Sequence, residues 1–69
     1  MQRPLEDLSP NARLVHENLA ADPESTRSVD TITDSLDGQL TGQEVEDALG
    51  ELQAAGRAAE TFGGWSVLL

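Results

Sequence analysis

Few side chains in this sequence have the chemistry for catalysis or metal binding. His16 is the only imidazole and the chain has no cysteine, so no second nitrogen or sulfur ligand could share a metal with it. Glu44 and Asp47 are three residues apart, a spacing that puts two carboxylates on one helix face and could suit a weak cation site. A solvated face is the ordinary interpretation of such a pair. We therefore assign no catalytic residue, no metal and no cofactor.

The sequence also lacks the motifs of the common enzyme classes. It contains no GxSxG elbow, no phosphate-cradling glycine loop, no HExxH pair and no Ser/His/Asp arrangement typical of hydrolases. A catalytic pair of carboxylates needs a cleft that raises the pKa of one acid, whereas the acids here fall on faces predicted to be wet. The sequence thus predicts a protein that is not an enzyme.

The charge balance is the most informative part of the composition. Thirteen Asp and Glu residues stand against four arginines and no lysine, which gives a formal net charge of −9. Such a surface repels nucleic-acid phosphate and acidic lipid. One interpretation is a protein that binds a basic partner or mimics an acidic ligand; the other is a composition typical of salt-loving organisms. The acids are scattered and form no block of five or six, which favours the second interpretation.

Length and hydropathy limit the class of protein further. Sixty-nine residues make one domain, which buries about 60% of its unfolded surface and should have modest stability. No apolar run approaches the roughly 20 residues that span a bilayer, and the first residues lack the apolar core of a signal peptide. We expect a soluble, cytoplasmic protein that does not bind membranes.

Residues 40–56 show the clearest helical pattern in the chain. Thr41 and Glu44 form a predicted capping box, and Leu40 with Val45 completes a hydrophobic staple. Gly56 stands where a left-handed residue would end the helix. The inner face follows the i, i+3, i+4, i+7 spacing of an amphipathic helix and comprises Val45, Ala48, Leu49 and Leu52. The outward face is acidic and carries Glu44, Glu46, Asp47 and Glu51.

Two further helices are predicted before this one. Residues 1–8 are expected to be a flexible lead-in from which Leu5 and Leu8 could dock on the core. A helix over residues 10–21 follows, with Ser9 as N-cap and Pro10 at its first position. Residues 22–27 are predicted to form a polar loop, and residues 28–36 a short helix capped by Ser28 or Asp30. The β-branched content of residues 28–36 leaves a strand as the alternative.

The end of the chain has the pattern of a β-hairpin. Residues 57–61 and 65–69 are short extended runs on either side of Phe62-Gly63-Gly64, and Gly-Gly supplies the positive φ of a tight turn. A two-stranded hairpin is unstable alone, so it must lie on the helices with Phe62 or Trp65 covering the edge of the core. A Trp in that place is usually structural.

Three helices followed by a hairpin resemble a winged-helix domain. The junction between the third helix and the hairpin carries the superfamily's typical spacing of Leu49, two residues, Leu52, three residues, Gly56 and then a strand. The opening Leu8-Ser9-Pro10 and the length resemble the C-terminal winged helix of the DNA-processing DprA/Smf family. The resemblance implies a mostly α winged helix-turn-helix with a two-stranded wing over residues 9–69, and a role in DNA handling or transcription.

The residues that would contact DNA depart from the winged-helix pattern. DNA-binding winged helices usually carry Arg, Lys, Ser, Asn or Gln on the third helix and cations in the wing. Here the third helix offers two glutamines among four acids, and four arginines could neutralise at most about four phosphates, below the six to ten contacts of salt-sensitive binders. The candidate DNA contacts are Arg13, Arg27, Gln43, Gln53 and Arg57.

Two hypotheses follow from these observations. The first is a protein-interaction winged helix whose acidic third helix docks a basic partner or a second copy of the chain. The second is a DNA-binding regulator of a halophile that contacts the phosphate backbone weakly through its arginines. The charge favours the first hypothesis and the frequency of the fold favours the second; we place the first narrowly ahead. Its candidate partner-binding residues are Gln43, Glu46, Asp47, Gly50 and Glu51.

Overall fold

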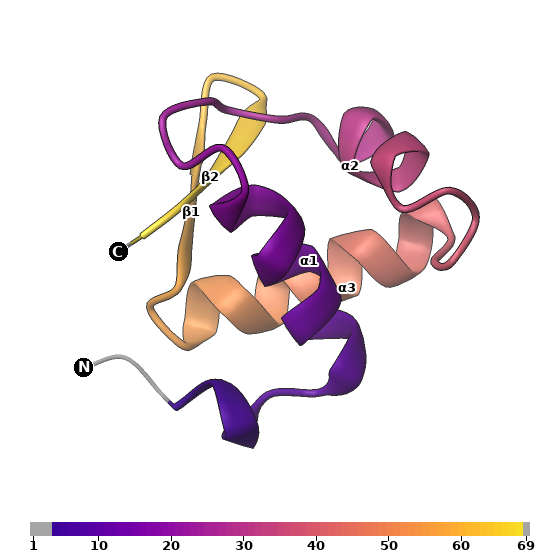
Figure 1. The fold of residues 1–69 in the computed structure, drawn as a ribbon. Helices are drawn as coiled ribbons and strands as arrows, with labels where there is room; N and C mark the ends of the chain where they lie inside the picture. The colour runs from indigo at the N-terminus through magenta and orange to yellow at the C-terminus, as the bar shows by residue number, and fades with distance from the viewer. Residues whose placement is uncertain (1–3, 69) are drawn as a thin grey trace.

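The chain folds as three helices followed by a β-hairpin, which confirms the predicted winged helix-turn-helix. The computed structural model describes residues 4–68. A short 3₁₀ helix η1 precedes helices α1, α2 and α3, and the antiparallel strands β1 and β2 form the wing (Figure 1). The bounds are Leu5–Asp7 for η1, Pro10–Ala20 for α1, Val29–Ser35 for α2, Gly42–Ala54 for α3, Ala58–Thr61 for β1 and Gly64–Val67 for β2.

Each of the three α-helices begins after a Ser or Thr N-cap, as the sequence predicts. The Ser9 side chain accepts a hydrogen bond from the backbone N–H of Ala12, and Pro10 occupies the first position of α1. Ser28 rather than Asp30 caps α2 and fixes residues 29–35 as a helix, so the strand alternative for this segment is wrong. In α3 both halves of the Thr41–Glu44 capping box are present. Local side-chain hydrogen bonds thus fix where the helices start.

The end of α3 is also fixed locally. Gly56 has a φ of +74°, the left-handed conformation expected of a residue that ends a helix. Its N–H donates to the Gln53 carbonyl, and the N–H of Arg57 donates to the Leu52 carbonyl at 2.8 Å. These two bonds make a Schellman motif, which satisfies the last carbonyls of the helix and turns the chain into β1.

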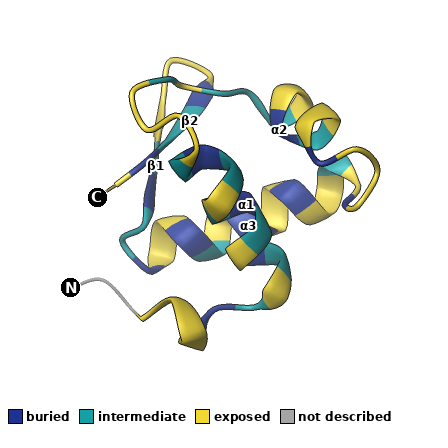
Figure 2. Ribbon diagram, viewed as in Figure 1, coloured by how far each residue is buried: buried dark blue, intermediate teal, exposed yellow. Residues whose placement is uncertain are grey.

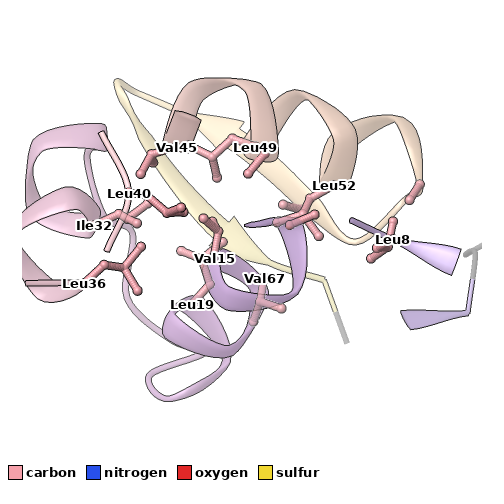
Figure 3. Packing of buried hydrophobic residues seen from close by; sticks show 14 residues of the cluster. Leu8, Val15, Leu19, Ile32, Leu36, Leu40, Val45, Leu49, Leu52 and Val67 are labelled. Atoms are coloured by element: carbon pink, nitrogen blue, oxygen red, sulfur yellow. The ribbon is translucent and has the colours of Figure 1, made fainter. Parts of the chain in front are cut away.

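One apolar core lies between the helices and the wing. Helix α1 packs on α3, α2 packs on α3 and α1, and the wing contacts both α1 and α3. The predicted inner face of α3 is buried, and Leu49 and Leu52 have no exposed surface. Figures 2 and 3 show the buried positions and the side chains that meet. The cluster comprises Leu8, Ala12, Val15, Leu19, Ile32, Leu36, Leu40, Val45, Ala48, Leu49, Leu52, Ala55, Ala58 and Val67.

The turn of the wing is one residue shorter than the predicted Phe62-Gly63-Gly64. Phe62 and Gly63 have φ values of +45° and +79°, and Thr61 pairs with Gly64, so the turn consists of Phe62 and Gly63, and the positive φ expected of both glycines occurs at Gly63 but not at Gly64. Gly64 instead begins β2, where a Cβ atom would lie 3.0 Å from the Cβ of Thr26. Close packing, rather than turn geometry, therefore favours a glycine at position 64. The predicted strand 65–69 ends at residue 67, and residue 69 lies outside the described residues.

The predicted polar loop at residues 22–27 ends in a residue that forms an isolated β-bridge with the wing. Arg27 and Trp65 exchange two backbone hydrogen bonds, with N–O distances of 2.9 and 2.7 Å. The segment between α1 and α2 is thereby attached to the outer edge of β2. Trp65 is half-buried and packs against the core, in line with its predicted structural role.

Part of the predicted lead-in contacts the core. Residues 5–7 form η1, and Leu8 is buried in the core, whereas Leu5 remains exposed. Residues 1–3 of the predicted lead-in lie outside the described residues.

Candidate interaction surface

The outward side of α3 presents four of the five predicted partner-binding residues. Gln43, Glu46, Asp47 and Gly50 are all exposed, and we call these four residues the α3 acidic face. The side-chain amide of Gln43 donates to the Asp47 carboxylate at 3.1 Å, so these two neighbours on the helix hold each other. Residues 42–54 contain no Arg, Lys or His. The face therefore offers hydrogen-bond acceptors and negative charge to anything that approaches it.

Glu51 does not belong to this outward face, which corrects the prediction. Its carboxylate is half-buried and accepts hydrogen bonds from the backbone N–H of Ser9 at 2.7 Å and from the Ser9 hydroxyl at 2.8 Å. In a local capping box, a Glu at the third helical position would bond that N–H, but α1 has Ala12 there. Glu51 supplies the missing carboxylate from α3. Its role is to tie the start of α1 to α3.

The arginines predicted to touch DNA do not gather on the α3 acidic face. Arg13 is exposed on α1. Arg27 is half-buried, and its guanidinium donates to the backbone carbonyl of Asn18 at 3.2 Å and to the Asn18 side-chain oxygen at 2.9 Å. Arg57 is also half-buried, at the base of the wing. Two of the three arginines in the described part of the chain are thus partly enclosed by the fold.

The two glutamines of α3 lie too far apart to contact neighbouring DNA bases together. Gln43 and Gln53 are both exposed, but ten residues separate them, which corresponds to about 15 Å along a helix. The Gln43 amide is already used by Asp47. A pair of adjacent bases could not be contacted by both side chains.

The pKa of His16 is lowered by the surroundings of its side chain. Burial lowers the pKa of His16 below its ordinary value of 6.5, and the nearby positive charge of Arg57 lowers it further. Its Nε2 atom is buried and makes no hydrogen bond to the described residues. These properties fit a histidine that is neutral and packed against the fold.

No metal site is found in the part of the chain that the structure describes. No three His, Asp or Glu residues there come close enough to hold an ion. Glu44 and Asp47 were the two carboxylates that could suit a weak cation site. One carboxylate oxygen of Glu44 accepts a hydrogen bond from the Thr41 N–H at 3.0 Å, so Glu44 serves the cap of α3.

Two surface features were not foreseen from the sequence. An open groove of about 310 Å³ lies between α1 and the α2–α3 turn, lined by Leu14, Glu17, Asn18, Ala21, Leu36 and Gln39. The other feature is Phe62, which is fully exposed at the tip of the wing. The sequence placed Phe62 in the turn but left open whether Phe62 or Trp65 covers the edge of the core, and it is Trp65 that packs there.

Comparisons of the chain with protein-family models, curated proteins and solved structures found no significant match. The function must therefore be inferred from the geometry of the chain itself. Within residues 4–68 no helix has both the length and the apolar character needed to cross a bilayer.

Proposed function

We propose that this chain is a non-enzymatic winged-helix domain that takes part in DNA handling or transcription by docking a protein with a basic surface. The single observation that carries the proposal is the α3 acidic face. The helix that winged-helix proteins commonly use for DNA exposes Glu46 and Asp47 here and contains no cation. The link to DNA handling rests on the fold and on the resemblance to the DprA/Smf family.

Electrostatics supports a basic protein as the ligand of this face. Complementary charge speeds the encounter of two proteins and suppresses wrong partners, because like charges brought together cost several kcal/mol. A DNA duplex or a second copy of this chain would bring negative charge against Glu46 and Asp47. Gly50 leaves open space in the middle of the face, with no atom within 4 Å of where a Cβ would stand. A partner's side chain can approach the helix backbone there.

The fold itself favours a second candidate, a weakly DNA-binding regulator of a halophilic organism. High cytoplasmic salt would shorten the Debye length to about 3 Å and reduce the repulsion between the acids and phosphate. This candidate needs Arg13, Arg27 and Arg57 as its phosphate contacts. It is less well supported because Arg27 already donates to Asn18 and Arg57 is half-buried.

Charge reversal tests the proposal. The double variant Glu46→Lys/Asp47→Lys keeps the buried face of α3, and exposed charges contribute little to stability, so the fold should persist. The protein partner is isolated with the immobilised natural chain, purified, and titrated against both forms over a salt series. We expect the double variant to lose at least about tenfold in affinity.

A matched control separates the face from the net charge. Glu17→Lys/Asp34→Lys reverses two exposed acids on α1 and α2. Each reversal adds two positive charges, so both double variants change the formal net charge from −9 to −5. The control should bind the partner almost as the natural chain does. Equal loss in both variants would show that the α3 acidic face is not the docking site.

A further inference from the structure

Phe62 at the tip of the wing is exposed without structural benefit. It is the most exposed of the large apolar side chains that the structure describes, with a relative exposure of 110%, compared with 41% for Leu68 and 38% for Leu5. Figure 2 shows the whole tip as exposed. An apolar ring held entirely in water gains nothing from the hydrophobic effect in the free domain.

The backbone of Phe62 is also in an unfavourable conformation. Its φ of +45° lies in the left-handed region, where a bulky residue is an outlier. Tight turns of this kind normally place Asn, Asp or Gly at such a position, because these residues tolerate positive φ. Backbone strain of this sort is frequent at ligand-binding sites.

The fold holds the tip on a firm support. Trp65 packs on the core and pairs through its backbone with Arg27, and Gly64 lies against Thr26 at close range. The hairpin is therefore braced on its outer edge by the segment between α1 and α2, beside which it lies in Figure 1. A turn whose supporting strand is held in place loses less backbone freedom when it binds.

The exposed charged groups of the wing strands and of the segment between α1 and α2 are acidic. Glu60 is exposed on β1, and Asp22 and Glu24 are exposed on the bracing segment. The nearest cation in that segment, Arg27, points its guanidinium at Asn18. A complementary surface must therefore combine an apolar pocket with a rim of positive charge.

We propose that Phe62 is an anchor that inserts into an apolar, Lys- or Arg-rimmed pocket of a protein partner. This inference rests on the proposed function in taking the ligand to be a basic protein. It adds a contact at the far end of the hairpin from α3, and the two contacts can be tested separately.

The first test measures strain in the free domain. Phe62→Asn places a residue that tolerates positive φ in the turn, and we expect its melting temperature to exceed that of the natural chain by about 4–8 °C. Phe62→Leu, which keeps an apolar residue in the same conformation, should melt within about 2 °C of the natural chain. A Phe62→Asn protein that melts at or below the natural temperature would overturn the inference.

The second test measures binding by calorimetry, using the partner captured by the immobilised natural chain, identified and purified. An anchor residue should account for at least about a 30-fold loss of affinity in Phe62→Asn, with a smaller loss in Phe62→Leu. The Glu46→Lys/Asp47→Lys variant is titrated in parallel. If only the Glu46→Lys/Asp47→Lys variant loses binding, the anchor inference fails and the proposed function stands. If only Phe62→Asn loses binding, the α3 acidic face is not the docking site and the anchor inference stands.

Three other outcomes would overturn the anchor inference. Concentration-dependent dimerisation of the natural chain that disappears in Phe62→Asn would make a second copy the occupant. Binding of duplex DNA that depends on Phe62 would make the ring a nucleic-acid contact. Equal affinity of the natural chain and Phe62→Asn for the purified partner would show that the ring contributes nothing to binding.

Discussion

Removing the Glu51 carboxylate should destabilise the domain far more than removing any acid of the α3 acidic face. Glu51→Ala deletes both hydrogen bonds to Ser9, at 2.7 and 2.8 Å, and leaves the Ser9 N–H without its partner. A hydrogen bond to a charged group contributes about 1.5–3 kcal/mol, and partial exposure of this contact reduces that contribution. We expect a loss of about 2 kcal/mol in the free energy of unfolding.

That loss is large for so small a protein. At about 0.05–0.15 kcal/mol per residue, the whole domain has a stability of about 3–10 kcal/mol. A loss of about 2 kcal/mol lowers the melting temperature of such a domain by about 8–16 °C. Urea denaturation, followed by the circular dichroism of the helices and the fluorescence of Trp65, measures the change.

Two variants show whether charge or hydrogen bonding carries the effect. In Glu51→Gln the amide oxygen can accept the Ser9 N–H while the amide nitrogen donates to the Ser9 hydroxyl, so a loss of about 1 kcal/mol or less is expected. Glu46→Ala removes the same unit of charge from an exposed site and should change stability by about 0.5 kcal/mol at most. If Glu51→Ala unfolds as easily as Glu46→Ala, the proposed tie between α1 and α3 contributes nothing.

Three further perturbations have definite expected results. Because the pKa of His16 is lowered in the folded state, the unfolded chain takes up the proton first as the pH falls. The natural protein should therefore lose stability relative to His16→Gln below about pH 6.5. A difference in unfolding free energy between the two proteins that stays constant from about pH 7.5 to about pH 5 would contradict this. Gly64→Ala should destabilise the domain by about 1 kcal/mol, because the new Cβ atom would lie 3.0 Å from the Cβ of Thr26, which must move by a few tenths of an ångström. Gly50→Ala, which meets open space in a helix, should stabilise the domain by about 0.5–1 kcal/mol. The same urea titration gives the order of the two. Salt should raise the melting temperature, because it screens the net repulsion of a chain that carries thirteen acids and only four arginines. A melting temperature that does not change up to about 1 M NaCl would contradict that expectation.

The features that could be predicted from the sequence are those fixed within a few residues of chain. Ser9, Ser28 and Thr41 each accept a hydrogen bond from an N–H three residues later, and such spacings are visible in the sequence. The inner face of α3 follows from the helical period. These local signals were sufficient for the three helices, the wing and the fold class.

The features that were missed depend on contacts between distant parts of the chain. Glu51 has the spacing of an exposed acid, and only the packing of α1 on α3 brings it to Ser9. The attachment of Arg27 to Trp65 joins residues 38 positions apart along the chain. The place of Gly64 in β2, and not in the turn, was missed because its close contact with Thr26 is visible in no local pattern. The candidate surface changed accordingly, by the loss of Glu51 and the addition of Phe62.

Titration of a fluorescent DNA duplex over a salt series tests the central claim most directly. The account predicts no measurable binding by the natural chain at about 0.15 M salt, because the α3 acidic face repels phosphate. It also predicts a gain in non-specific affinity for Glu46→Lys/Asp47→Lys, with a steeper dependence on salt as new phosphate contacts form. Sub-micromolar, sequence-selective binding by the natural chain would contradict the account and identify the protein as a DNA-binding regulator.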